Sequence, residues 1–316
     1  MLNRRYLRIK VFQSLYAHWQ GEESGASRLE KELHSGMERT RDLYLALLLV
    51  FGELRHVAEL RIEGRGKKHM PTDSDLNPNK RFVEGTVIQA VVGNDQLRIE
   101  AEKRRVSWVG NHELFVRMYK ELEECPEYQA YMSGPTPGVA KERDFLVWVL
   151  SDRIANSEAL QDVFESRSIY WLEDLDLAAS MVKRTLELFR EGTSIELDLA
   201  ALALDQTEEK EFVTTLFRKA IELGEEHEAA ISEKASNWDT DRIALSDMIL
   251  MKMALTEVRV FDQIPIKVTL NEYIEIAKSY STPKSKNFIN GVLDKIFIEM
   301  KADGRIKKVG RGLLES

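Results

Sequence analysis

The stretch PKSKNFINGVLDKIFIEMKA, residues 283–302, decides the fold of this chain. Its apolar residues recur every three or four positions, which is the spacing of one buried helix face. Thr282-Pro283 just before it has the form of an N-cap followed by a first-turn proline. The pattern therefore predicts a helix over 283–302 whose buried residues are Phe288, Ile289, Val292, Leu293, Ile296 and Met300.

Similar helical patterns precede this stretch. They predict helices over 206–231, 238–259 and 265–280, and Thr269-Leu270-Asn271-Glu272 has the form of a capping box. At the other end of the chain, Leu7, Val11, Leu15 and Trp19 recur every four residues and predict a helix over 3–19. A long helix is expected over 27–62. No alternating strand pattern exceeds a few residues, so we predict an all-α protein built of helical bundles.

The middle of the chain is interrupted twice. Residues 63–81 are polar and rich in Gly and Pro, which is typical of a linker, and residues 133–138 (SGPTPG) mark a second break. Residues 141–181 also resemble 208–248 at a constant offset of 67, with Phe145 matching Phe212 and Trp171 matching Trp238. A diverged duplication and two merely similar antiparallel helix pairs both explain this echo.

Composition excludes several classes of protein. Cys125 is the single cysteine, so an internal disulfide or a cysteine-cluster metal site is excluded. The first residues do not form an apolar signal sequence, and the most apolar run, 43–51, is about half of the roughly 20 residues that cross a bilayer. We expect a soluble cytoplasmic protein without a membrane partner.

Charge is distributed unevenly although the net charge is −8. The first 20 residues carry four basic and no acidic side chains, and residues 265–308 carry nine Lys or Arg against five Asp or Glu. The middle is therefore acidic. A face built from the two basic ends would attract phosphates, while the acidic body would limit indiscriminate binding.

Several separate blocks of the sequence are similar to motifs that occur together in one order. Residues 265–280 are similar to P-x-K-V-x-I-N-E-x-x-E-x-A-K-x-[FY], and 288–295 to F-V-N-G-V-L-D-K. Residues 4–16 look like R-R-x-x-R-x-x-x-x-Q-x-L-Y. These blocks resemble the NusB family of transcription antitermination proteins, and Asp241 with Ala254-Leu255-Thr256-Glu257 resembles the central helix of that family.

The resemblance implies an all-helical adaptor with no catalytic chemistry and no cofactor. Members of the family pair with NusE, a small-subunit ribosomal protein, bind the boxA element of single-stranded RNA and join an antitermination complex on RNA polymerase during ribosomal RNA synthesis. It further implies a NusB-like RNA-binding domain at 206–316, completed by the N-terminal helix at 1–25. Residues 26–205 would then be a helical insertion, whose role, homodimerisation included, the sequence leaves open.

Site residues follow from the matched motifs. Cations would hold phosphates, and flat side chains or amides would contact the bases. The predicted RNA-binding residues are Arg4, Arg5, Arg8, Lys278, Tyr280, Lys284, Lys286, Asn287, Phe288 and Asn290. The predicted NusE-binding residues are Tyr16, Asp241 and Asp247.

Other interpretations compete with these assignments. By spacing alone Phe288 is a core residue, Tyr280 a packing lid and the basic helix face an ordinary solvated surface. The chain is more than twice as long as typical members, Tyr6 stands where many have another arginine, and Lys284 stands where an acidic residue is common. A protein-interaction scaffold with a degenerate RNA site is therefore an alternative. A NusB-like domain also occurs in ribosomal RNA cytosine methyltransferases, but Glu124-Cys125-Pro126 lacks the Gly-rich cofactor loop of such enzymes.

Overall fold

The computed structural model describes residues 4–21, 25–190, 206–235 and 243–313. Every regular element within these ranges is a helix, which confirms the all-α prediction. Contacts divide the chain into two compact units, which we call unit 1 (Met1–Ser35 with Leu204–Ser316) and unit 2 (Gly36–Ala203). The long helix α2 (Ala26–Gly66) contributes its first turns to unit 1 and the remainder to unit 2.

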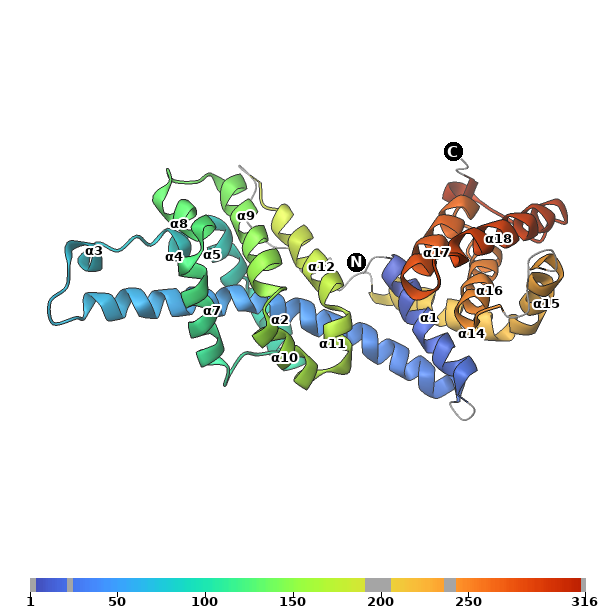
Figure 1. Cartoon of the computed structure of the whole chain (residues 1–316), viewed down its shortest axis with the longest axis horizontal. Coiled ribbons are helices and arrows are strands. Elements are labelled where there is room, and N and C mark those ends of the chain that lie inside the picture. The colour runs from blue at the N-terminus through green and yellow to red at the C-terminus, as the bar shows by residue number, and fades with distance from the viewer. Residues whose placement is uncertain (1–3, 22–24, 191–205, 236–242, 314–316) are drawn as a thin grey trace. The chain divides into compact units, whose positions relative to one another are not determined.

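Unit 1 is a bundle arranged around α16 (Leu245–Val260), most of whose residues are buried. Helices α1 (Arg4–Gln20), α14 (Gln206–Glu222), α15 (Gly224–Ala235), α17 (Ile266–Tyr280) and α18 (Ser285–Ala302) all pack on it. The N-terminal helix thus lies among the C-terminal helices, against α14, α16 and α17 (Figure 1). A short 3-10 turn, Gly310–Leu313, follows.

The C-terminal helices begin slightly differently from the sequence-based expectation. Helix α17 starts after Pro265 without a side-chain cap, because Thr269 is buried and donates to Glu257 at 2.8 Å in place of capping. Helix α18 starts at Ser285, two residues after the predicted proline. Its predicted apolar face is buried, except that Phe288 is only half-buried.

Unit 2 is built around the middle of α2. From Leu43 to Phe51 this helix is buried on nearly all sides, as expected of a helix surrounded by others, and from Leu54 to Ala58 one face remains buried. The surrounding elements are α3 (Asp73–Leu76), α4 (Arg81–Glu84), α5 (Thr86–Val92), α6 (Asp95–Arg104), α7 (His112–Glu124), α8 (Pro126–Ser133), α9 (Val139–Trp148) with a π-helical continuation (Val149–Ile154), α10 (Glu158–Arg167), α11 (Ile169–Glu173) and α12 (Leu175–Glu187). The segment predicted as a linker contains α3, and the predicted break at 133–138 separates α8 from α9 (Figure 1).

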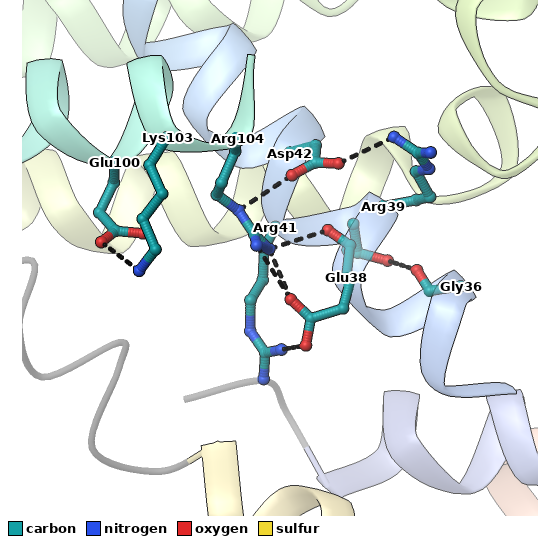
Figure 2. Close-up of polar contacts among 9 residues, drawn as sticks. Gly36, Glu38, Arg39, Arg41, Asp42, Glu100, Lys103 and Arg104 are labelled. Atoms are coloured by element: carbon teal, nitrogen blue, oxygen red, sulfur yellow. Dashed lines mark hydrogen bonds and ion pairs between the residues drawn. The ribbon is translucent and has the colours of Figure 1, made fainter. Parts of the chain in front are cut away.

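An ion-pair network joins α6 to α2 within unit 2. Arg104 binds Glu38 at 2.6 Å and Asp42 at 3.0 Å, and Arg41 and Arg39 bind the same two carboxylates (Figure 2). Burial raises the pKa of Asp42, although the nearby arginines oppose this. The network therefore depends on Arg104 to compensate a largely desolvated carboxylate.

The 67-residue echo extends from the sequence to the helices. Shifted by 67, Val139–Ile154 falls on α14 and Glu158–Arg167 falls within α15. Buried residues pair in the same register, whereas Trp238 and Asp241 lie outside the described residues. The pairs buried in both units include Glu142/Glu209, Phe145/Phe212, Leu146/Val213, Val149/Leu216, Leu150/Phe217, Leu160/His227, Phe164/Ile231, Val182/Ile249 and Leu186/Met253.

No helix in the described ranges is both long and apolar enough to span a membrane.

A candidate nucleic-acid interface

Arg8 lies in the core of unit 1. Its guanidinium donates to both carboxylate oxygens of Glu257 at 2.7 Å, and the two side chains are 2% and 0% exposed. Thr269 and Tyr273 donate to the same carboxylate at 2.8 and 3.0 Å. Burial alone would lower the pKa of Arg8, but the charge and hydrogen bonds of Glu257 outweigh it and the pKa is raised. Arg8 therefore fastens α1 to α16 and is withdrawn from the predicted phosphate contacts, because it cannot reach solvent.

Arg4 and Arg5 lie at the surface of the same helix. Arg5 donates to both oxygens of Glu272 on α17 at 2.8 Å and is 42% exposed, and the hydrogen bond to Glu272 raises its pKa. Arg4 pairs with Glu208, and its guanidinium lies 5.1 Å from the ring centre of Phe212. The Arg4 pair is exposed and the Arg5 pair is partly exposed, so both contribute less to stability than a buried pair and a phosphate could displace either carboxylate.

Aromatic residues connect α1 with the end of α17. The ring of Tyr280 meets Phe12 edge-on at 5.5 Å between centroids, and Phe12 in turn lies 6.1 Å from Tyr16. Tyr280 and Tyr16 are both half-buried. Tyr280 is thus partly a packing residue, as the alternative interpretation held, but it retains an exposed portion.

The turn between α17 and α18 is held by a network of hydroxyl groups. Ser281 donates to the carboxylate of Asp247 at the start of α16, and its oxygen lies 3.0 Å from the hydroxyls of both Ser246 and Ser285. Thr282 lies 2.8 Å from Ser285. Because most of these groups sit in one partly buried cluster, the turn has a defined conformation. These serines carry no motif signal of their own, so the sequence alone did not indicate them.

Basic and amide side chains project from this turn. Lys284, Lys286 and Asn287 are exposed, and Phe288 and Asn290 are half-buried, with Asn290 donating to Asp294 at 3.0 Å. Lys278, near the end of α17, pairs with Glu275. Within the part of the chain that the structure describes, neither Lys284 nor Lys286 forms an ion pair.

The predicted RNA-binding residues therefore form two groups along α17. Arg5 contacts it at Glu272, whereas Tyr280 and the lysines of the turn lie about two helical turns further on, roughly 12 Å along the axis. Arg4 and Arg5 make one group, and the turn makes the other. Both groups flank the same helix of unit 1.

The structure describes two of the predicted NusE-binding residues, Tyr16 and Asp247. Tyr16 lies beside Phe12, at the same end of α17 as the turn. Asp247 is only 5% exposed and is occupied by Ser281, so its carboxylate supports the turn more directly than it offers a contact surface. Asp241 lies outside the described residues.

Cys125, the residue that the methyltransferase alternative required as a nucleophile, is buried between α7 and α8. Its thiol lies 3.1 Å from the carbonyl oxygen of Glu121, and burial raises its pKa. A buried, protonated thiol is a poor nucleophile.

Comparison with known proteins places this geometry in context. The model of the NusB family matches residues 172–297. A transcription antitermination protein NusB of Salinibacter ruber is 45% identical over 105 residues, which are 33% of this chain and 66% of the relative. The corresponding protein of Chloroherpeton thalassium is 41% identical over 106 residues, 34% of this chain and 50% of the relative. That of Listeria monocytogenes is 36% identical over 111 residues, 35% of this chain and 87% of the relative. The chain thus spans less than two thirds of the first two relatives. No solved structure matches the chain.

Proposed function

This chain belongs to the NusB family, and on that basis we propose that it is an RNA-binding adaptor of transcription antitermination. In this proposal it pairs with NusE, binds boxA-type single-stranded RNA and joins the antitermination complex on RNA polymerase that supports ribosomal RNA synthesis. It acts in the cytoplasm without a catalytic step. The relatives named above are themselves called transcription antitermination proteins.

The observation that carries the proposal is the turn between α17 and α18. It presents Lys284 and Lys286, both without an ion pair among the described residues, on a conformation fixed by the Ser281 cluster. Single-stranded RNA is bound by cations along the phosphates and by flat groups at the bases. Half-buried Tyr280 and Phe288 flank the turn and supply such groups, and Asn287 supplies an exposed amide.

The proposed RNA surface consists of this turn together with Arg4, Arg5 and Lys278, with Asn290 at its margin. Each surface arginine exchanges a carboxylate for a phosphate when RNA binds. Tyr16 belongs to the proposed NusE surface, whereas Asp247, which is buried, supports the neighbouring α17–α18 turn through Ser281.

Salt dependence tests the proposal. We would measure binding of boxA-like single-stranded RNA by filter binding over a range of salt concentrations, with and without NusE. If Lys284 and Lys286 each contact one phosphate, the Lys284→Ala/Lys286→Ala variant lowers the slope of log K against log salt by about 1.4. Lys31→Ala/Lys307→Ala is the matched control, because it removes two exposed lysines of unit 1 outside the turn. An unchanged slope in the turn variant would refute the phosphate contacts.

One observation favours a second candidate, a protein-interaction scaffold with a degenerate RNA site. Arg4, Arg5 and Arg8 are each bound to a carboxylate of the chain itself. The same filter-binding titration separates the two candidates. A scaffold with a degenerate RNA site would bind NusE, but it would not retain the RNA on the filter, either alone or together with NusE.

A further inference from the structure

Unit 2 contains a cleft that the proposed function does not use. Its volume is about 450 Å³, within the roughly 300–1,000 Å³ typical of small-molecule sites. One wall is the last turns of α2, where Ala58, Arg61, Ile62 and Arg65 share a face. The opposite walls come from the segment around α3 and α4, the end of α7, and α8.

The floor of the cleft is aromatic. The ring centroids of Phe82, Tyr119 and Tyr128 lie 5.7 to 6.1 Å from one another, with Phe82 meeting Tyr128 edge-on at 5.7 Å. The hydroxyls of Tyr119 and Tyr128 are 2.7 Å apart. Burial raises the pKa of both, so they stay protonated. The bond between them uses only one of their two hydrogens, and the other remains to donate.

The cleft is lined by two arginines, Arg61 and Arg65, and two carboxylates, Glu123 and Asp75. Asp75 is already paired with Lys68, which lies outside the lining, at 3.1 Å, so three cations face two carboxylates at this rim. Arg61 and Arg65 both pair with a single carboxylate, that of Glu123. One arginine would suffice to link α2 to α7 through Glu123. Arg61 already does so, and its guanidinium also lies 5.8 Å from the ring centre of Tyr119. Arg65 is 51% exposed and its contact with Glu123 is the longer one, at 3.3 Å. The guanidinium of Arg65 lines the cleft and carries five N–H donors, more than its one contact with Glu123 uses.

We propose that this cleft binds a nucleotide, with Arg61 and Arg65 holding the phosphate and the aromatic floor contacting the base or sugar. Guanidinium groups match the oxygens of a phosphate, and the apolar floor accommodates the uncharged body. The nucleotide comes either from solution or from a base splayed out of single-stranded RNA. Both sources present the same chemistry to the cleft.

Calorimetric titration of the full chain tests the proposal with three probes: adenosine monophosphate, adenosine and inorganic phosphate. The nucleotide should bind saturably and at least tenfold more tightly than either part alone. Absence of saturable nucleotide binding overturns the proposal. Equal affinity for adenosine overturns the anion site, and equal affinity for inorganic phosphate overturns the role of the floor.

Variants locate the binding. Arg65→Met should weaken nucleotide binding about tenfold or more, because it removes a charge-assisted contact. Arg98→Met is the matched control, since Arg98 is 73% exposed on α6 of the same unit, pairs with Asp95 and lies outside the cleft. If Arg65→Met lowers thermal stability, nucleotide affinity is measured in Tyr128→Phe in its place. This variant removes one hydroxyl and keeps the ring, and it should bind the nucleotide more weakly than the wild-type chain does. Equal affinity in Arg65→Met and Arg98→Met would overturn the assignment.

A competition arm distinguishes the sources of the nucleotide. A short single-stranded RNA that displaces adenosine monophosphate from the wild-type chain, and does so less well in Arg65→Met, identifies RNA as the source. Failure to displace it identifies a free nucleotide. RNA binding through Lys284 and Lys286 is measured separately, so either proposal can fail without the other.

Discussion

Replacement of Arg8 by methionine tests whether this arginine is structural. Methionine keeps much of the apolar volume but leaves the carboxylate of Glu257, which is 0% exposed, with only the hydroxyls of Thr269 and Tyr273 as donors. Loss of one partner from a buried ion pair costs about 3–5 kcal/mol, because the remaining charge is desolvated and uncompensated. We therefore expect the Arg8→Met variant to destabilise unit 1 by about that amount.

A double variant isolates the charge. Arg8→Met/Glu257→Gln removes the stranded charge, while the amide oxygen still accepts from Thr269 and Tyr273, so it should recover about 2 kcal/mol relative to Arg8→Met. The Arg5→Met variant is the control, since its exposed pair with Glu272 contributes less than about 1 kcal/mol.

Native-state hydrogen exchange is the suitable assay, because the two units can unfold separately and denaturant curves of the whole chain would mix them. The free energy of opening is read from peptides of α1 and α16. The structural role of Arg8 is refuted if Arg8→Met costs no more than Arg5→Met. It is equally refuted if Arg8→Met lowers RNA affinity while the stability of unit 1 is unchanged.

Three further predictions concern other parts of the molecule. In unit 2, Arg104→Ala should cost about 2–3 kcal/mol and raise the pKa of Asp42 further, whereas Lys103→Ala, an exposed neighbour on the same helix, should cost little. Native-state hydrogen exchange of peptides from α2 and α6 compares the two variants. His227 is 3% exposed and burial lowers its pKa from 6.5 to about 4, so the unfolded chain binds more protons between these values. The contribution of His227 to the stability of unit 1 should be constant above pH 6.5 and should fall by up to about 3 kcal/mol as the pH drops to 4. His227→Gln should remove this pH dependence, which hydrogen exchange of α15 peptides measures between pH 4 and 7. Ser281→Ala should raise hydrogen exchange in the α17–α18 turn and weaken RNA binding severalfold, and unchanged exchange would contradict the role of the hydroxyl cluster.

Periodicity predicted the helices well because it reports burial directly. The apolar spacing placed α1 and α17 to within a residue or two, and it identified most of the buried face of α18. The echo at an offset of 67 does not by itself decide between a duplication and two similar helix pairs, and the helices Val139–Ile154 and α14 fall in that register. These features depend on local patterns, which a single sequence contains.

Long-range polar pairing could not be predicted in this way. Arg8 and Glu257 are 249 residues apart, and nothing in either local pattern indicates that they meet. Arg8 was predicted to bind phosphate because it matches the family pattern over residues 4–16, and an arginine is seldom fully buried unless it is paired. Thr269 looked like a helix cap because residues 269–272 have the form of a capping box. Its actual acceptor, Glu257, lies on another helix and leaves no trace in that local pattern.

The arginines of α1 differ in how readily a phosphate could take over their contacts. Replacing Glu272 at Arg5 exchanges one exposed ion pair for another, so it costs little beyond the repulsion between the phosphate and a displaced carboxylate. Replacing Glu257 at Arg8 would strand a buried carboxylate and separate α1 from α16. The proposed RNA surface must therefore pass over Arg4 and Arg5 without entering the bundle. Because these two retain competing carboxylates while Lys284 and Lys286 have none among the described residues, the lysine turn should form the first contact and the arginines should follow.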